Sequence, residues 1–282
     1  MTLRIACGDS LCSLLPQAGG SIGGWRVNGQ EMFRSALDEN DPLKSASFPL
    51  VPYSNRIADA RFDWNGEKVQ LVADDLSPPH AIHGLGWKRP WEVREAGADF
   101  ATLILCHSPD ANWPWPFAAE QKFSVDEASL SVKMTARNLA DCAVPLAFGH
   151  HPYFESEGAT LTFEASAFLP TGERSLPAEQ VALAPASDFS NGLAVSGIEL
   201  DNQFAGWTGT AEIRWKGAPL GLRITSNLSH AVVFTPSAAD FFCFEPVPHL
   251  TNALNRRDGD MPVIEPAESF TAQIRFEAIR PL

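Results

Sequence analysis

The chain has 282 residues, of which 45% are hydrophobic and 20% are charged, a composition typical of globular proteins. A chain of this length forms either two average domains or one large β-sandwich or barrel. The formal net charge of −13 repels phosphate backbones and anionic lipids. It therefore argues against nucleic acids and membrane surfaces as partners.

The N-terminus and the cysteines predict a cytoplasmic protein. The apolar stretch within residues 1–15 is interrupted at positions 7–10, so it does not resemble a signal peptide. The sequence has no run of about eighteen apolar residues, so we expect no membrane span. The five cysteines lack the spacing of a zinc site, and we expect them to be reduced. They stand at positions 7, 12, 106, 142 and 243.

An alternation of apolar and polar residues, which is typical of half-buried strands, recurs along the chain. It first appears at Phe62 and Trp64, and it resumes at Val69 after Asn65 and Gly66. An Asn-Gly pair between alternating segments predicts a β-hairpin. The same pattern flanks the polar turn at 126–129 and returns in three later segments. Its apolar positions there are Phe123, Val125, Leu130, Val132, Met134, Ile213, Trp215, Leu220, Leu222, Ile224, Phe270, Ala272, Ile274 and Phe276.

Helical spacing is nowhere sustained for about a dozen residues, and 22 prolines and 20 glycines interrupt the chain. Strands that bury one face and expose the other are typical of antiparallel sheets. The most loop-like stretch, at 170–197, stands between strand patterns and so does not indicate a domain boundary. We therefore predict an all-β fold in which residues 1–282 form a single domain.

Four short segments depart from this pattern. The first contains Asn55 and Arg56, and an arginine there is either a solvated strand end or a cation that binds a ligand. The second contains His80 and His83, followed by Gly84, which suggests a turn that lets the backbone approach a neighbour closely. Histidines three positions apart point to opposite faces of an extended strand, and no third ligand follows at a typical spacing. We therefore expect no bound metal.

The third and fourth segments offer an imidazole and a carboxylate. Neighbouring His150 and His151 face opposite ways in a strand, so only one of them can serve a given site. A histidine among aromatic residues is either a hydrogen-bonded core residue or a catalyst. Glu245 ends the apolar run at 241–244. Because burying an unpaired carboxylate costs several kcal/mol, Glu245 either pairs with a cation or uses a shifted pKa.

Together, the four segments supply general acids and bases without a nucleophile. The sequence contains no Gly-x-Ser-x-Gly motif and no phosphate-binding glycine loop. Such a set of residues suits the transfer of protons between oxygen atoms.

In order and approximate spacing, these segments resemble the motifs of the aldose 1-epimerase (galactose mutarotase) family, in its bacterial, uncharacterised branch. The matching fragments are Asn55-Arg56-Ile57, Ile82-His83-Gly84, His151-Pro152-Tyr153-Phe154, Leu200-Asp201-Asn202-Gln203-Phe204 and Phe244-Glu245-Pro246. Five motifs in the correct order, spread over nearly the whole chain, make the resemblance specific. It implies an antiparallel β-supersandwich with a sugar bound in an open cleft on one sheet.

The resemblance also implies a role for each matching residue. Glu245 would take the proton of the anomeric O1 hydroxyl, and His151 would protonate the ring oxygen. The ring would then open, rotate about the C1–C2 bond and reclose on the other face of the aldehyde. His83 would assist His151 or hold the sugar, while Arg56 and Asp201 would bind its hydroxyls.

Two more residues are assigned to the substrate. Asn55 belongs to the motif of Arg56, and Trp207 follows Asp201 closely enough in the sequence to stack on a sugar face. At neutral pH, we expect a carboxylate on the base and an imidazolium on the acid. The reaction exchanges neither electrons nor groups with another molecule, so we expect no cofactor, and the partner is a small monosaccharide.

Several alternatives stay open. The sequence departs from the better-known galactose mutarotases at 84–86 and at 149–154, so the preferred sugar is undetermined. A shift of the third motif by one position would make His150 the acid, although the His-x-Tyr-Phe match favours His151. A hexose-6-phosphate mutarotase would need a cationic phosphate site, for which the candidates are Arg56, Arg61, Lys88 and Arg89. A non-catalytic sugar-binding or sensor protein could dispense with Glu245 or His151.

Overall fold

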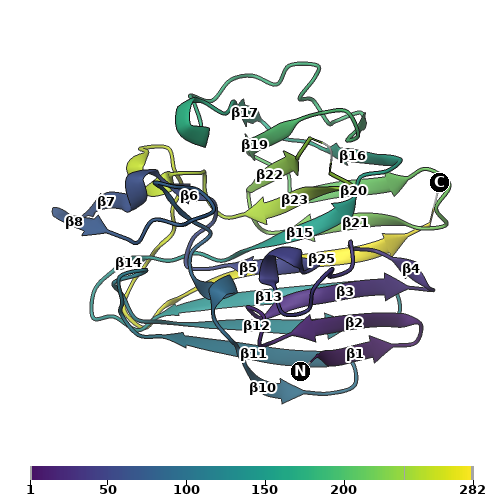
Figure 1. Cartoon of the computed structure of the whole chain (residues 1–282), viewed down its shortest axis with the longest axis horizontal. Helices are drawn as coiled ribbons and strands as arrows, with labels where there is room; N and C mark the ends of the chain where they lie inside the picture. Colours follow the sequence, from purple (N-terminus) through teal and green to yellow (C-terminus); the bar gives the residue numbers. More distant parts are fainter. Residues whose placement is uncertain (1, 238, 281–282) are drawn as a thin grey trace.

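The computed structural model describes residues 2–237 and 239–280, and most of its strands belong to two large antiparallel sheets (Figure 1). The all-β prediction is confirmed. The helical segments of the described residues are 3₁₀ turns of three residues each: η1 (Pro42–Lys44), η2 (Ala58–Ala60), η3 (Gly86–Lys88), η4 (Glu173–Ser175) and η5 (Ala253–Asn255). No helix in this part of the chain is long and apolar enough to span a membrane.

The first sheet has ten strands in the order β1-β2-β3-β5-β15-β23-β22-β19-β17, with β4 beside β3. Its strands are β1 (Leu3–Cys7), β2 (Ser10–Leu15), β3 (Ser21–Val27), β4 (Gln30–Glu31), β5 (Ser47–Leu50), β15 (Gly149–Glu155), β17 (Ala167–Leu169), β19 (Leu200–Ala205), β22 (His230–Thr235) and β23 (Phe241–Val247). This sheet therefore joins the N-terminal strands to strands from the second half of the chain.

The second sheet has nine strands in the order β10-β11-β12-β13-β25-β21-β20-β16-β18. They are β10 (Glu92–Ala96), β11 (Phe100–His107), β12 (Phe117–Val125), β13 (Ser129–Asn138), β16 (Ala159–Phe163), β18 (Leu193–Ala194), β20 (Thr210–Trp215), β21 (Gly221–Ser226) and β25 (Ser269–Ile279). Three strand pairs complete the fold: β6 (Arg56–Ile57) with β9 (Ala81–Ile82), β7 (Arg61–Trp64) with β8 (Glu67–Gln70), and β14 (Val144–Pro145) with β24 (Val263–Ile264).

Local turn chemistry accounts for the tight hairpins. In β7–β8, Trp64 pairs with Glu67, which leaves Asn65 and Gly66 as a two-residue turn. Their φ angles are 52° and 85°, and a type I′ turn requires positive φ at both positions. Between β12 and β13, the Asp126 carboxylate accepts a hydrogen bond from the Ser129 hydroxyl. Both predicted hairpins are therefore present.

The main hydrophobic core lies between the two large sheets, and Phe33 links them. Its ring is 5.5 Å from that of Phe154 in the first sheet and 4.8 Å from that of Phe276 in the second, measured between ring centroids. The ring of Trp25, on β3, is 5.9 Å away. All four side chains are at most 1% exposed. A layer of aromatic side chains thus fixes the separation of the sheets.

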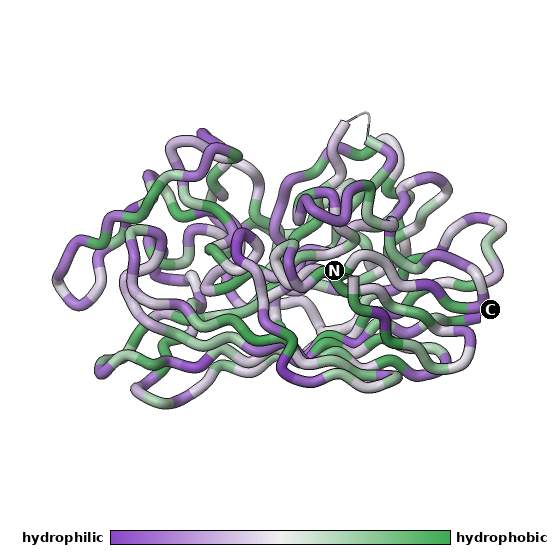
Figure 2. The backbone as a smooth tube through the Cα atoms, turned by 60° about the horizontal axis from the view of Figure 1, so that its bottom comes forward, coloured by the Kyte–Doolittle hydropathy of each residue, from purple (hydrophilic) through white to green (hydrophobic). Residues whose placement is uncertain are grey.

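A smaller apolar cluster lies on the other face of the ten-stranded sheet. On β15, Phe154 belongs to the main core, whereas its neighbour Tyr153 packs with Phe48, Trp87 and Cys243 in the smaller cluster. Successive side chains of a strand point to opposite faces. In Figure 2 this alternation appears as changes of colour along the strands. The outer face of this sheet therefore carries its own apolar cluster, and the candidate site lies beside it.

We predict that Phe33→Ala lowers the free energy of unfolding by about 3–5 kcal/mol, because it opens a cavity where the two sheets meet. Leu37→Ala is the control: the Leu37 side chain is 70% exposed, so its loss changes stability by less than about 0.5 kcal/mol. Urea denaturation of both variants measures the difference. Equal, small effects would contradict the bridging role of Phe33.

Candidate active site

Strand register brings His151 and Glu245 together. Antiparallel β15 and β23 pair Tyr153 with Cys243 and Phe154 with Phe242. Continued by two residues, this register places His151 opposite Glu245. The His151 Nε2 atom lies 3.2 Å from the Glu245 Oε1 atom. The two residues are only 7% and 2% exposed, so an imidazole and a carboxylate touch in a nearly dry environment.

Aromatic rings hold the His151 imidazole in place. The ring of Phe48, on the neighbouring strand β5, stacks on it with a centroid separation of 4.5 Å and an angle of 19°. The ring of Tyr153 lies 4.8 Å away on the same face of the sheet. These contacts leave the ring edge with Nε2 directed at Glu245, while the buried Nδ1 atom has no hydrogen-bond partner among the described residues.

His83 reaches the same place from a loop. Its backbone N–H donates to the Asn55 carbonyl at 3.0 Å, and the Asn55 N–H donates to its Nδ1 atom at 3.1 Å. Both residues have positive φ, 58° and 55°, a region that asparagine tolerates better than most residues. Because Nδ1 accepts a hydrogen bond, the neutral ring carries its proton on Nε2. The His83 and His151 rings lie 5.4 Å apart in an edge arrangement.

Gly84 allows this loop to pack against β5. Its φ is 66°, and a Cβ atom there would lie 2.3 Å from the carbonyl oxygen of Val51. Any side chain would therefore clash with backbone as well as strain the left-handed conformation. The close backbone approach expected from this glycine is present, and it sets the position of the preceding His83.

Arg56 and Asp201 form a second pair beside the first. The Arg56 Nη2 atom lies 3.2 Å from the Asp201 Oδ2 atom, and Arg56 Nε donates to the Ser77 hydroxyl at 2.9 Å. The Asn55 side-chain oxygen accepts from the Arg56 backbone N–H at 2.8 Å. The Asp201 side chain is 34% exposed. This pair is therefore the more accessible part of the site.

Burial controls the protonation of the acid–base pair. It raises the pKa of Glu245 well above its ordinary value, nearby Asp201 adds to this effect, and Arg56 opposes it. Burial lowers the pKa of His151 to about 3 and also lowers that of His83, with positive charge on His151 and Arg56 adding to the effect. Each change disfavours a buried charge.

Burial therefore opposes the carboxylate and the imidazolium that the sequence predicts at neutral pH. The sequence-based expectation used exposed reference values, whereas burial stabilises a neutral pair. Desolvation favours the neutral form of both groups, in which a proton of the pair lies on the Glu245 carboxyl group.

His150 points away from this site. Its Nδ1 atom lies 2.7 Å from the Ser47 hydroxyl, and its Nε2 atom lies 2.7 Å from the Gln121 side-chain oxygen. Gln121, on β12 of the opposite sheet, donates its own amide to the Gly20 carbonyl. His150 is thus a satisfied histidine between the sheets, and both of its ring nitrogens are used there.

Trp207 does not reach the site, which corrects its assignment as a wall for the sugar. Its ring packs 5.2 Å from that of Phe244 and belongs to the main core, and it is 3% exposed. Phe244 and its neighbour Glu245 point to opposite faces of β23. Because Trp207 lies on the Phe244 side, the sheet separates it from the acid–base pair.

Sequence reasoning missed several residues around the site. Phe48 and Tyr153 shape the surroundings of His151, and Ser77 holds Arg56. Tyr153 stood within a quoted motif, but Phe48 and Ser77 carry no local signal because their roles depend on long-range pairing. His80 instead links two loops, because its ring nitrogens contact the Asp59 N–H and the Arg174 carbonyl.

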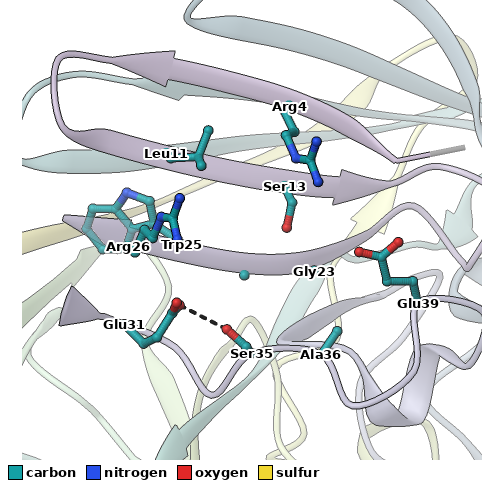
Figure 3. Close-up of a pocket in the computed structure, with 11 residues that line it drawn as sticks. Arg4, Leu11, Ser13, Gly23, Trp25, Arg26, Glu31, Ser35, Ala36 and Glu39 are labelled. Atoms are coloured by element: carbon teal, nitrogen blue, oxygen red, sulfur yellow. Dashed lines mark hydrogen bonds between the residues drawn. The ribbon is translucent and has the colours of Figure 1, made fainter. Parts of the chain in front are cut away.

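A separate hollow of about 410 Å³ lies over β1, β2 and β3 (Figure 3). Its lining includes Arg4, Ser13, Arg26 and Glu39, together with the backbone of Gly23. None of the paired residues described above borders it. The hollow is wide and polar but contains no buried acid–base pair, so the chemistry points to the site between β15, β23 and β19.

Comparison with known proteins identifies the family and the fold. The model of the aldose 1-epimerase family matches residues 1–277. The uncharacterised YphB protein of Escherichia coli K12 is 27% identical over 97% of this chain and 98% of its own length. An aldose 1-epimerase of Haemophilus influenzae is 31% identical over 44% of this chain and 39% of its own. A solved structure from Escherichia coli K12, provisionally described as an aldose 1-epimerase, has a TM-score of 0.93 at 24% identity and covers 100% and 99% of the two chains.

We predict that His150→Ala lowers the free energy of unfolding by about 1–3 kcal/mol, because it leaves buried polar partners unpaired. The double variant His150→Ala with Ser47→Ala should lose less stability than the sum of the two single variants. The reason is that Ser47→Ala removes a hydroxyl that His150→Ala leaves without a hydrogen-bond partner. Urea denaturation of the three variants measures the coupling. Strict additivity would contradict the proposed structural role of His150.

Proposed function

The chain belongs to the aldose 1-epimerase family, and we propose that it is a mutarotase that interconverts the α and β anomers of a free aldose. The observation that supports this most directly is the contact between His151 and Glu245. A cyclic aldose is a hemiacetal, and its O1 hydroxyl and ring oxygen are bonded to the same carbon. An acid and a base that serve these two oxygens must therefore lie close together, as this pair does at 3.2 Å.

In the proposed reaction, Glu245 accepts the proton of the O1 hydroxyl while His151 donates a proton to the ring oxygen. The bond between C1 and the ring oxygen breaks, and C1 becomes an aldehyde carbon. Rotation about the C1–C2 bond presents its other face, and the same two groups reverse their roles during closure. Protons and bonds balance over the cycle, and each group returns to its starting state.

This cycle needs the shared proton on His151 when the sugar is bound. A sugar hydroxyl that donates to the Glu245 carboxylate favours its charged form, and nearby Arg56 acts in the same direction. Substrate binding thus shifts the proton towards the state that reacts. In the ligand-free protein, burial favours the neutral form of both Glu245 and His151.

The other residues bind and orient the sugar in this proposal. His83 presents Nε2–H as a neutral donor, because its Nδ1 atom accepts from the Asn55 backbone. It therefore holds a sugar oxygen and does not supply the proton. Arg56 and Asp201 separate slightly to bind ring hydroxyls, with a donor on one side and an acceptor on the other. Asn55 acts mainly through its contacts with Arg56 and His83.

A phosphorylated substrate is less well supported. The cations considered for a phosphate are already paired with carboxylates: Arg56 with Asp201, Arg61 with Asp59, Lys88 with Asp74 and Arg89 with Asp110. The buried Glu245 adds a further carboxyl group beside Arg56.

A non-catalytic sugar-binding role would not require a buried acid–base pair, which is costly to maintain.

We predict that Glu245→Gln lowers kcat roughly 10²–10⁴-fold, equivalent to about 3–5 kcal/mol, because it removes one general acid–base group. His151→Asn should have a similar effect. His150→Asn should leave kcat near the wild-type value, since that side chain faces the core. Polarimetry of freshly dissolved α-D-glucose and α-D-galactose measures all three, and equal losses for both histidine variants would overturn the choice of His151.

The pH profile is expected to be bell-shaped, because the reactive form of the pair carries one proton. On the acid side, a second proton binds near the lowered pKa of His151, about 3, and removes the base. On the alkaline side, activity is lost when the last proton leaves, above the ordinary glutamate value of 4.5. Values of kcat/KM against pH, corrected for buffer catalysis, test this. An acid limb centred at 4.5 would contradict the neutral buried pair.

A further inference from the structure

Residues 170–178, here named the strap, follow β17 and include η4 (Figure 1). Thr171, Ser175 and Pro177 of the strap line a small cavity together with Arg56 and Asp201. Its volume is about 10 Å³, close to the room that a single water molecule needs. No second sugar ring fits between the strap and the Arg56–Asp201 pair in this arrangement.

Hydrogen bonds fix both ends of the strap. At its start, the Thr171 hydroxyl donates to the Asp201 carbonyl at 2.6 Å, and the Asn202 side chain donates to Thr171 Oγ1 at 2.9 Å. At its end, Arg256 donates to the Ala178 carbonyl at 3.4 Å. The start of the strap is thus attached to β19, the strand that carries Asp201.

The middle of the strap is held to η2, which directly follows the strand of Arg56. The Arg174 guanidinium forms an ion pair with the Asp59 carboxylate through both of its terminal nitrogens. The His80 ring accepts from the Asp59 N–H at 3.0 Å and donates to the Arg174 carbonyl at 3.1 Å. Arg174 and Ser175 both have positive φ, 60° and 58°, a conformation that persists where surrounding contacts impose it.

Sheet order shows which end of a bound sugar would face the strap. The strands run β15, β23, β22, β19 and β17, so His151 and Glu245 come first, Asp201 follows and the strap lies beyond. Neighbouring strands are about 4.8 Å apart, which places the Asp201 strand roughly 10 Å from that of Glu245. In the proposed binding mode, with C1 at the acid–base pair and ring hydroxyls on Arg56 and Asp201, the ring positions opposite C1 point towards the strap.

On the basis of the proposed mutarotase function, we propose that the strap restricts the substrate to monosaccharides and that the Arg174–Asp59 ion pair is its latch. A reducing disaccharide linked through O4 carries its second ring on the side opposite C1, where the strap lies. The free hydroxyls of a monosaccharide end at Arg56 and Asp201. The strap thereby sets substrate size without taking part in proton transfer.

The test compares D-glucose with maltose and cellobiose, two reducing disaccharides linked through O4. For the wild type, kcat/KM for both disaccharides should lie below that for glucose by roughly 10-fold or more, the discrimination that a closed pocket wall supplies. Equal kcat/KM values for glucose and the disaccharides would overturn the proposal. Absence of acceleration for every monosaccharide would instead overturn the proposed function.

Latch variants provide the second arm. Arg174→Gln and Asp59→Asn should each raise the disaccharide-to-glucose ratio of kcat/KM about two- to fivefold, the range for losing one exposed ion pair. The double variant should match either single variant, because all three remove the same contact. Arg275→Gln, which removes an ion pair with Asp126, is the matched control and should leave the ratio unchanged.

Hydrogen–deuterium exchange gives a readout that is independent of catalysis. Amides of residues 171–181 should exchange faster in Arg174→Gln than in the wild type, while those of β12 and β13 should not change. Unchanged exchange in the strap, together with an unchanged disaccharide ratio, would show that Arg174 does not hold it and would overturn the latch.

Discussion

The site depends on one constraint: two strands must pair in the register that sets His151 against Glu245. A shift of one strand by one residue would turn its own side chain, His151 or Glu245, into the core and bring Pro152 or Phe244 to the outer face. The aromatic layer between the sheets makes such a shift costly, because Phe154, Phe242 and Phe244 are all fully buried on the core side. Core packing therefore determines the geometry of an acid–base pair on the other face.

The same burial determines the electrostatics. A carboxyl group and an imidazole that are almost completely removed from water share one proton more favourably than they hold two separate charges. Arg56 and Asp201, which are more accessible, form the second pair of the site, an ion pair. The cluster thus combines a dry reacting pair with a wetter binding pair. In the ten-stranded sheet, β22 separates the strand of Glu245 from that of Asp201, while Arg56 lies on the separate strand β6.

Much of this could be predicted from the sequence, and the failures have a common cause. Period-two alternation and turn residues at Asn65 and Gly66 predict the strands and a hairpin, because these signals are local. Alternation also predicts that His150 and His151 face opposite ways, but it cannot tell which face becomes the core. Trp207 lies in the core because closeness to Asp201 in the sequence does not decide the face of the sheet on which a side chain lies. The pKa directions and the strap depend on burial and long-range contacts, which local patterns do not contain.

The contact between Asn55 and His83 has a consequence for sequence variation. The group that fixes the tautomer of His83 is a peptide N–H, which every residue except proline supplies. Selection at position 55 therefore acts first on backbone conformation, since the left-handed φ of 55° favours asparagine, aspartate or glycine. Position 55 can thus change among these few residue types while the His83 ring keeps its tautomer and orientation.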